Sequence, residues 1–131
     1  MRGAVRSDVY AFVAEEYGVE PEYLWADAPG YGVLRHPMSK KWFGIVMDVP
    51  YARLRLDGEG SVDVLNVKLL PEMRGGIPTE PGFLPAYHMS HTHWVSILLD
   101  GSVPKEKVFA FIEASYSCVE SKARKRRDED R

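Results

Sequence analysis

The feature that most constrains the fold of this chain is the alternation of apolar side chains over residues 42–49, Trp-Phe-Gly-Ile-Val-Met-Asp-Val. Side chains of an extended strand point alternately to its two faces, and here one of the two faces is fully apolar. The pattern therefore predicts a strand with one buried side, interrupted at Pro50. The residues expected on the buried side are Phe43, Ile45, Met47 and Val49.

Other strands are predicted on both sides of this one. Residues 33–37 predict a strand that is joined to it by a tight turn within residues 36–41. Residues 93–102, His-Trp-Val-Ser-Ile-Leu-Leu-Asp-Gly-Ser, predict the last strand. The segment before it, residues 71–85, holds a short helical turn at most and then a loop rich in Pro and Gly.

Residues 51–70 resemble a hairpin whose turn is Asp-Gly-Glu-Gly at 57–60. In its second arm Val62 and Val64 share one phase, whereas the apolar residues from Leu65 onward have the opposite phase. A shift of one residue turns every side chain to the other face, so we expect either a bulge near Leu65 or burial of both faces. In the first arm Leu54 and Leu56 alternate with Arg53 and Arg55.

Helices are predicted at both ends of the chain. Residues 7–18 form the first, with Ser7 as its N-cap and Gly18 as its stop, and residues 103–127 form the second, with Pro104 in its first turn. The order is one helix, four or five largely antiparallel strands and one helix, which predicts an α+β two-layer sandwich. The apolar stripes are Val9, Phe12, Val13 and Tyr17 in the first helix, and Val108, Phe111, Ile112, Ser115 and Val119 in the second.

The length of 131 residues fits one domain, which we expect to span residues 1–120, followed by a charged, flexible tail at 121–131. The longest apolar runs fall far short of the roughly 20 residues of a membrane helix, and the first residues build no apolar signal-peptide core. Cys118 is the single cysteine, which excludes an internal disulfide and cysteine-rich zinc sites. These features predict a cytoplasmic protein without a membrane partner.

Charge is distributed unevenly along the chain. Residues 1–120 hold 11 Lys and Arg against 16 Asp and Glu, whereas residues 121–131 hold six against three. Nucleic acids are bound by basic side chains that neutralise phosphates, so the acidic body argues against broad contact with DNA. The basic tail could supply such contacts, or it is simply a solvated helix end.

Three segments, at residues 62–72, 81–104 and 112–119, appear in an order and spacing that resemble the MmcQ/YjbR family of small bacterial proteins. They carry the hairpin, the His-Trp strand entry with the Leu-Asp-Gly-Ser-Val-Pro approach to the helix, and the Ser-Tyr pair. The resemblance covers roughly residues 5–120. It implies a compact α+β fold related to the bacterial frataxin-like fold and a "double-wing" DNA-binding function. We expect no cofactor. Fold alone does not settle function.

The loop before the last strand departs from the family pattern. The family usually has Pro-Gly-Tyr-His-Met-Asn-Lys before the His-Trp pair, whereas this chain inserts residues and places Ser90 and His91 at the Asn and Lys positions. An unperturbed histidine is mostly uncharged at neutral pH. The substitution therefore weakens a phosphate contact by this loop.

The three histidines of this loop, His88, His91 and His93, raise the question of a metal site. In an extended segment His91 and His93 share a face and could share an ion, but His88 faces away and the sequence places no carboxylate beside them. The chain also has no nucleophile-elbow motif and no Cys-His pair at recognisable spacing. We therefore expect neither metal ligands nor catalytic residues, and a metal-binding protein or metal-dependent enzyme is a minor alternative.

A structural corner explains the histidine-rich loop better. Trp94 is expected to bury its ring at the start of the strand, His93 to bind a loop carbonyl, and Asn66 to satisfy other loop groups from a neighbouring strand. The same residues could instead form a cleft for a small ligand or a protein. The residues assigned to this corner or cleft are Asn66, Tyr87, His88, Ser90, His91, His93, Trp94, Ser115 and Tyr116.

The leading functional hypothesis, which follows from the resemblance, is a non-enzymatic protein that binds DNA weakly and mostly through charge. The alternative is that the basic residues are ordinary surface charge. In that case the His/Trp corner binds a small ligand or a protein. The residues expected to contact nucleic acid are Lys40, Lys41, Arg53, Arg55 and Lys68.

Overall fold

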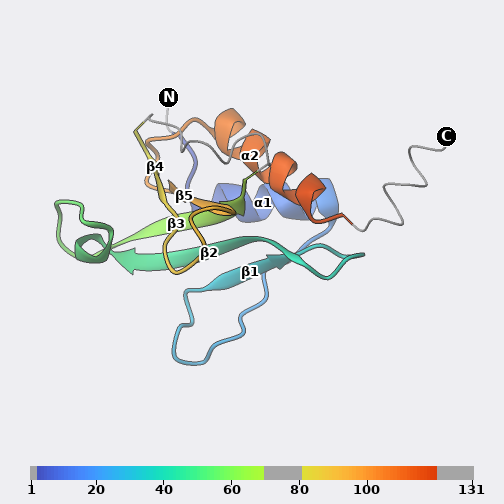
Figure 1. The fold of residues 1–131 in the computed structure, drawn as a ribbon, viewed down its shortest axis with the longest axis horizontal. Helices are drawn as coiled ribbons and strands as arrows, with labels where there is room; N and C mark the ends of the chain where they lie inside the picture. Colours follow the sequence, from blue (N-terminus) through green and yellow to red (C-terminus); the bar gives the residue numbers. More distant parts are fainter. Residues whose placement is uncertain (1–2, 70–80, 121–131) are drawn as a thin grey trace.

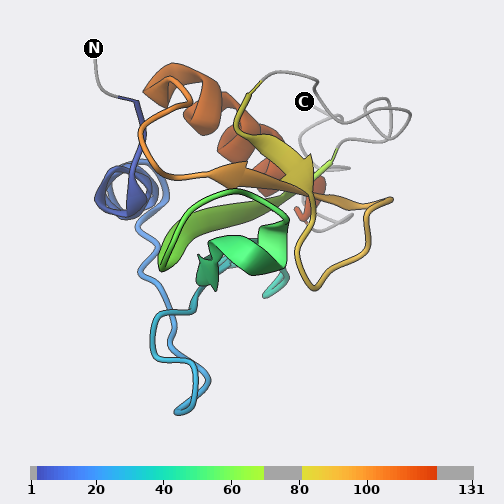
Figure 2. The ribbon, with the colours of Figure 1, turned by 90° about the vertical axis from the view of Figure 1, so that its left-hand side faces the viewer.

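The computed structural model describes residues 3–69 and 81–120, so the predicted tail and most of the predicted turn after residue 70 lie outside the described residues. Its five strands form one antiparallel sheet with the order β1-β2-β3-β5-β4. Both helices lie on the same side of this sheet (Figure 1; Figure 2). The predicted α+β two-layer architecture is confirmed. The elements are α1 (Arg6–Tyr17), β1 (Gly32–Arg35), β2 (Trp42–Pro50), the 3-10 helix η1 (Tyr51–Leu54), β3 (Ser61–Lys68), β4 (Phe83–Pro85), β5 (Trp94–Leu98) and α2 (Lys105–Cys118).

The sheet face that carries the two helices, the helix face, holds the larger core. Val9 and Val13 of α1 and Val108 and Ile112 of α2 are fully buried in it, as the apolar stripes predicted. The N-cap of α1 lies two residues earlier than predicted, at Val5 and not at Ser7, and the Val5 backbone N–H donates to Asp8 Oδ2 at 2.9 Å. The strand residues of this core are Leu34, Phe43, Val46, Leu65, Val67, Phe83, Val95 and Ile97.

The opposite face of the sheet, the open face, carries a second apolar cluster that loops cover instead of helices. Strand β3 pairs with β2 in unbroken register from Pro50↔Ser61 to Gly44↔Val67, so the predicted bulge near Leu65 is wrong. The second alternative, burial of both faces, is confirmed, since Val64 and Leu65 are both fully buried. The buried residues of the open face are Val33, Ile45, Met47, Val49, Val62, Val64 and Leu98.

A β-bulge lies instead in β2. Leu34 pairs with Gly44 but Arg35 pairs with Trp42, which leaves Phe43 as an extra residue. Phe43 therefore packs in the helix-face core, and the prediction that it shares a face with Ile45 is wrong.

The predicted first arm of the hairpin at 51–56 is wrong. Strands β2 and β3 form the hairpin, and residues 51–60 are its long connection, beginning with η1. Arg55 ends η1 in the left-handed region at φ 58°, so Arg53 and Arg55 are not strand residues. Leu54 and Leu56 point to the same cluster because η1 folds against the open face, and this packing produces an alternation that resembles a strand.

Strand β4 was predicted as loop. Only three residues long, it lies at the sheet edge, where Pro85, which lacks an N–H group, is tolerated. Phe83 enters the helix-face core and Leu84 packs on the open face, so this short strand contributes to both cores.

Ser115 of α2 ties the helix to the sheet at the bulge. Its hydroxyl donates to the Phe43 carbonyl at 2.5 Å and accepts from the Lys68 backbone N–H at 2.9 Å, and the residue is fully buried. The bulge releases a backbone group from the ladder, and a buried backbone group needs a partner. Ser115 supplies one to each strand.

We expect Ser115→Ala to lower the free energy of unfolding by about 1–3 kcal/mol, because it leaves buried backbone groups unsatisfied. Ser117→Ala, on the exposed side of the same helix, is the matched control and should change stability by less than about 0.5 kcal/mol. Urea unfolding of both variants measures the difference. Equal stability of the two variants would show that Ser115 does not hold the bulge.

Candidate functional site

The loops that cover the open face leave a cavity of about 360 Å³. Two tryptophans, Trp25 and Trp42, and Tyr31 supply its aromatic wall, and we call this cavity the aromatic cleft. Trp25 packs edge-on against Tyr31, with centroids 6.0 Å apart, and against Trp42, with centroids 5.9 Å apart. Trp25 remains 36% exposed, so part of its ring is accessible to a ligand. The full lining is Trp25, Asp27, Ala28, Tyr31, Trp42, Ile45, Met47, His88 and Met89.

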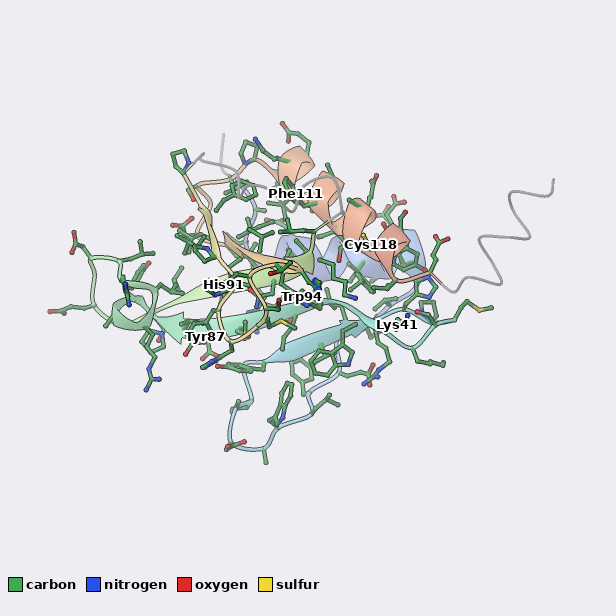
Figure 3. All side chains as sticks on the ribbon, in the orientation of Figure 1. Lys41, Tyr87, His91, Trp94, Phe111 and Cys118 are labelled. Atoms are coloured by element: carbon green, nitrogen blue, oxygen red, sulfur yellow. The ribbon has the colours of Figure 1, made fainter. Side chains whose placement is uncertain are left out.

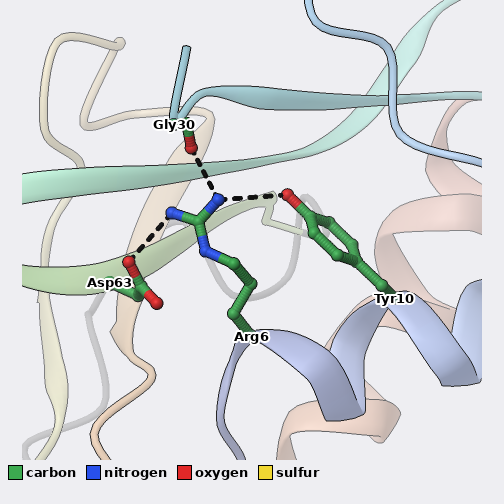
Figure 4. Close-up of polar contacts among 4 residues, drawn as sticks. All are labelled: Arg6, Tyr10, Gly30 and Asp63. Atoms are coloured by element: carbon green, nitrogen blue, oxygen red, sulfur yellow. Dashed lines mark hydrogen bonds and ion pairs between the residues drawn. The ribbon is translucent and has the colours of Figure 1, made fainter. Parts of the chain in front are cut away.

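The connector at residues 19–31, which carries Trp25, hangs on the side of the sheet away from the helices (Figure 1). Its end is fixed by Arg6, whose guanidinium donates to the Gly30 carbonyl at 2.7 Å and pairs with Asp63 at 2.8 Å (Figure 4). A Cβ at Gly30 would lie 2.2 Å from Asp48 Oδ1, so a larger residue there would require the exposed Asp48 side chain to move. Arg6 also contacts the hydroxyl of Tyr10 at 3.4 Å, and burial raises the pKa of Tyr10 to about 12, so its phenol stays neutral.

A buried polar clamp fixes the other wall of the cleft. Asn66 Nδ2 donates to the Tyr87 carbonyl at 2.9 Å, and the Tyr87 N–H donates to Ser96 Oγ at 3.0 Å. The Ser96 hydroxyl in turn donates to Asn66 Oδ1. Asn66 and Ser96 are cross-strand partners on β3 and β5, and both are fully buried. The prediction that Asn66 satisfies loop groups from a neighbouring strand is confirmed.

His88 follows the clamped Tyr87 and adopts a left-handed backbone conformation with φ 61°. Such conformations cost free energy in residues other than glycine and occur often at functional sites. The exposed His88 side chain lines the aromatic cleft and also a second recess of about 430 Å³. We call it the basic recess; its lining is Arg53, Leu54, Arg55, Leu84, Pro85, Ala86, Tyr87, His88 and His91.

The residues predicted to contact nucleic acid do not gather in one patch. Arg53 and Arg55 lie just beyond one end of β2, in the basic recess, whereas Lys40 and Lys41 lie just before its other end. Lys68, at the end of β3, places its ammonium 5.8 Å from the centre of the Trp94 ring. Figure 3 labels Lys41 and His91, which lie far apart on the molecule.

The predicted His/Trp corner is confirmed in part. Trp94 is buried, at 8% exposure, but the side chain of His93 is exposed, so the expectation that its imidazole pins the loop is wrong. The anchor is its backbone: the His93 carbonyl accepts from the Leu69 N–H at 2.8 Å, and its N–H donates to the Ser90 carbonyl.

Ser115 and Tyr116 lie on the helix face, on the other side of the sheet from the side chains of this loop. The Tyr116 ring stacks on Tyr17 with centroids 3.8 Å apart and contacts His36 at 4.3 Å. Ser115 nevertheless bonds to the edge of the corner, because its hydroxyl accepts from the N–H of Lys68, the cross-strand partner of Trp94.

All three loop histidines, His88, His91 and His93, are exposed. Within residues 3–69 and 81–120, no group of three or more His, Cys, Asp or Glu side chains is placed to hold a metal ion. In the same part of the chain no helix is long and apolar enough to span a bilayer.

Sequence reasoning missed three contributors to the site region. Trp25 and Tyr31 lie in a connector to which the sequence analysis assigned no role, and Ser96 lies in a predicted strand without a role of its own. His36, which is 2% exposed, was also missed: its Nδ1 accepts from the Met38 and Ser39 N–H groups and shapes the turn that carries Lys40 and Lys41. The signal for Ser96 was a polar residue within an apolar strand, since a buried hydroxyl needs a partner.

A two-layer α+β domain with a five-stranded antiparallel sheet and a loop-covered open face defines the class of this protein. The family model YjbR matches residues 14–118. The uncharacterized protein YyaQ of Bacillus subtilis strain 168 is 40% identical over 111 residues, which cover 85% of this chain and 94% of the relative. The chain therefore belongs to the YjbR family.

Solved structures agree with this assignment. A crystal structure of a Pseudomonas syringae protein has a TM-score of 0.83 and 32% identity, and the match covers 88% of this chain and 98% of that one. A Deinococcus radiodurans protein of the DUF419 domain type has a TM-score of 0.64 over 92% of this chain and 81% of its own. Its 23% identity shows likeness of fold alone.

We expect Trp94→Ala to lower the free energy of unfolding by about 3–5 kcal/mol, the usual range for truncating a buried tryptophan. His91→Ala and His93→Ala should each cost less than about 0.5 kcal/mol, because both side chains are exposed. Urea unfolding followed by circular dichroism compares the three variants. If His93→Ala lowers the free energy of unfolding almost as much as Trp94→Ala does, the His93 imidazole, and not only its backbone, holds the loop in place.

Proposed function

We propose that this protein is a cytoplasmic, non-enzymatic binding protein that holds the planar apolar ring of a small ligand in the aromatic cleft. The observation that carries the proposal is the cavity of about 360 Å³ that Trp25, Trp42 and Tyr31 line, on the sheet face that neither helix covers. Ligand pockets typically have volumes of about 300–1,000 Å³ and a mostly apolar lining with a few polar groups. The cleft meets this description, with Asp27 and His88 as its charged or titratable groups besides Tyr31.

The walls of the cleft are held in place before a ligand binds. Arg6 fixes the end of the connector at Gly30, and the Asn66–Ser96 pair fixes the opposite loop at Tyr87. A preorganised site loses less conformational entropy on binding, which favours affinity. Edge-to-face aromatic contacts such as those of Trp25 add about 0.5–1.5 kcal/mol beyond buried area.

A binding role, rather than catalysis, is supported by the chemistry of the lining. Tyr31 is the phenol of the cleft, and burial raises its pKa, so it stays protonated at neutral pH and is a poor base. Cys118, the single thiol, lies on α2 on the other side of the sheet from the cleft. A single cysteine, which excludes an internal disulfide, is also consistent with a reducing compartment.

The neutral dye N-phenyl-1-naphthylamine tests the cleft, because its fluorescence rises on transfer to an apolar site. We expect saturable one-to-one binding to the full chain. Trp25→Ala should weaken it about ten-fold or more, a loss of about 1.4 kcal/mol. Leu24→Ala removes an exposed apolar side chain of the same connector that does not line the cleft, and it should stay within about two-fold. If Trp25→Ala leaves the affinity for the dye unchanged, or if the full chain shows no saturable binding, the proposal is wrong.

Weak, electrostatic DNA binding is a second candidate, and the placement of the basic residues favours it. Lys40 and Lys41 are exposed at one end of the nine-residue strand β2, and Arg53 and Arg55 are exposed beyond the other end. Nine strand residues span about 30 Å, near the roughly 34 Å of one duplex turn. We call the two pairs, Lys40 with Lys41 and Arg53 with Arg55, the cationic tips. At this separation they could contact phosphates one duplex turn apart.

For DNA we expect affinity that falls with salt, with a slope of log K against log [salt] of about −4 if four phosphates are neutralised by the tips. Deleting residues 121–131 should reduce low-salt binding more than Arg53→Ala with Arg55→Ala, because the tail holds six basic side chains. Fluorescence anisotropy with a labelled duplex between 50 and 200 mM salt measures both effects. If the truncated chain binds as tightly as the full chain and prefers one DNA sequence, the electrostatic account is wrong. Base-specific contacts by the cationic tips would then be favoured.

A further inference from the structure

His88 lines both the aromatic cleft and the basic recess, so the two cavities are neighbours. We propose that one ligand occupies both: its planar ring lies in the aromatic cleft, and its anionic group lies in the basic recess between Arg53 and Arg55. The ligand class is then a nucleotide-like compound, with a planar ring and a phosphate separated by a short spacer. This inference rests on the proposed function and adds an anionic group to the planar ring of the ligand.

The charge of the recess supports an anionic ligand. Two arginines and two histidines line it, and its remaining lining residues are Leu54, Leu84, Pro85, Ala86 and Tyr87, none of which carries a carboxylate. Asp57 and Glu59 of the same connection are exposed and do not line the recess. The guanidinium group presents several donors in a fixed planar arrangement that matches phosphate oxygens, which makes arginine well suited to this task.

Backbone conformation is a second observation that points to the recess. Among the described residues, three that are not glycine have positive φ: Lys40, Arg55 and His88. Two of these three line the basic recess. Arg55 is held in this conformation by hydrogen bonds across its turn, from its own N–H to the Ala52 carbonyl and from Leu56 to Tyr51. Strain of this kind persists where the surrounding structure enforces it, and it often accompanies a functional site.

The floor of the recess is also fixed in advance. Ala86 is buried, Tyr87 is clamped by Asn66 and Ser96, and Leu84 belongs to β4, which pairs with β5. The recess is therefore built from the end of one strand and one tight turn. A spacer is needed between ring and phosphate because the two cavities are distinct and have only His88 in common among their lining residues.

Isothermal titration of the full chain with AMP, adenosine and ribose 5-phosphate tests the inference. We expect AMP to bind at least about ten-fold more tightly than adenosine, and ribose 5-phosphate to bind more weakly than AMP. Arg55→Ala should remove the advantage of AMP over adenosine. Trp25→Ala should weaken AMP and adenosine together.

Lys40→Ala is the matched control for Arg55→Ala. Both residues are exposed cations with left-handed backbone conformations, φ 65° and φ 58°, but Lys40 lies at the other end of β2 and lines neither cavity. It should leave the advantage of AMP intact. If Lys40→Ala removes that advantage as fully as Arg55→Ala does, the effect is general electrostatics and the inference is wrong.

The outcomes separate this inference from the proposed function. If the neutral dye and adenosine bind in a Trp25-dependent way but AMP binds no more tightly than adenosine, the aromatic cleft stands and the inference fails. If AMP binding depends on Arg55 but not on Trp25, no single ligand spans the two cavities, and the inference also fails.

The same nucleotide chemistry could come from a free nucleotide or from single-stranded DNA, and a pentadeoxyadenylate distinguishes them. Tighter binding of the pentamer than of AMP, with the same dependence on Arg55 and Trp25, identifies single-stranded DNA as the source. Weaker or equal binding of the pentamer identifies the free nucleotide. Both results support the shared site. If Arg55→Ala and Trp25→Ala both leave the affinity for the pentamer unchanged, that result argues against the site.

Discussion

Strand β3 is buried on both faces, but both helices lie on one of them, and this asymmetry determines much of the structure. The open face must be covered by loops: the connector at 19–31, the η1 turn and the segment around Tyr87. Loops fill space less completely than a helix laid along a sheet, because their backbone polar groups must also be satisfied. The connector and the segment around Tyr87 border the aromatic cleft, and the η1 turn and the same segment border the basic recess. The site is thus a consequence of covering an apolar sheet face with irregular chain.

Covering the open face also explains its buried polar pair. Asn66 and Ser96 lie on a face that otherwise contributes Val64, Leu98 and other apolar side chains, and burying them unpaired would cost roughly 1–3 kcal/mol each. Bonded to each other and to both backbone groups of Tyr87, they hold a loop that has no helix or strand to dock it. The hydrogen bonds specify one loop position where apolar packing alone would permit several.

On the helix face Ser115 does the corresponding work, since it bonds to the strands where the bulge at Phe43 opens the ladder. In the described part of the chain, each face of the sheet therefore has a buried polar fastening where regular pairing or regular packing ends.

The parts of this fold that depend on local pattern could be predicted from the sequence. The alternation at 42–49 marks β2, and the apolar stripes mark both helices. The bulge at Phe43 could not be found this way, because it is defined by the register against β1. The alternation of Leu54 and Leu56 was misleading, because tertiary packing of η1 on the open face produces the same pattern as a strand.

The candidate site was harder to predict than the fold. The histidine-rich loop drew attention to His88 and His91, and both line the basic recess, but the aromatic half of the site was not expected. Trp25 and Trp42 lie on different segments, and only the return of the connector against the sheet brings their rings together. Because this contact depends on the path of a loop, no characteristic spacing of the two residues in the sequence could have predicted it.

Charge distribution favours a small anion over a long one at the basic recess. Residues 1–120 hold 16 acidic against 11 basic side chains, so a polyanion laid across the domain meets net repulsion. At physiological ionic strength charges are screened beyond about 8 Å, so a single phosphate in the recess interacts mainly with Arg53 and Arg55. Each further phosphate outside the recess loses that attraction and approaches the acidic surface. The local cationic lining within an acidic body therefore selects for a ligand whose charge is confined to one end, and the aromatic cleft beside it receives the uncharged remainder.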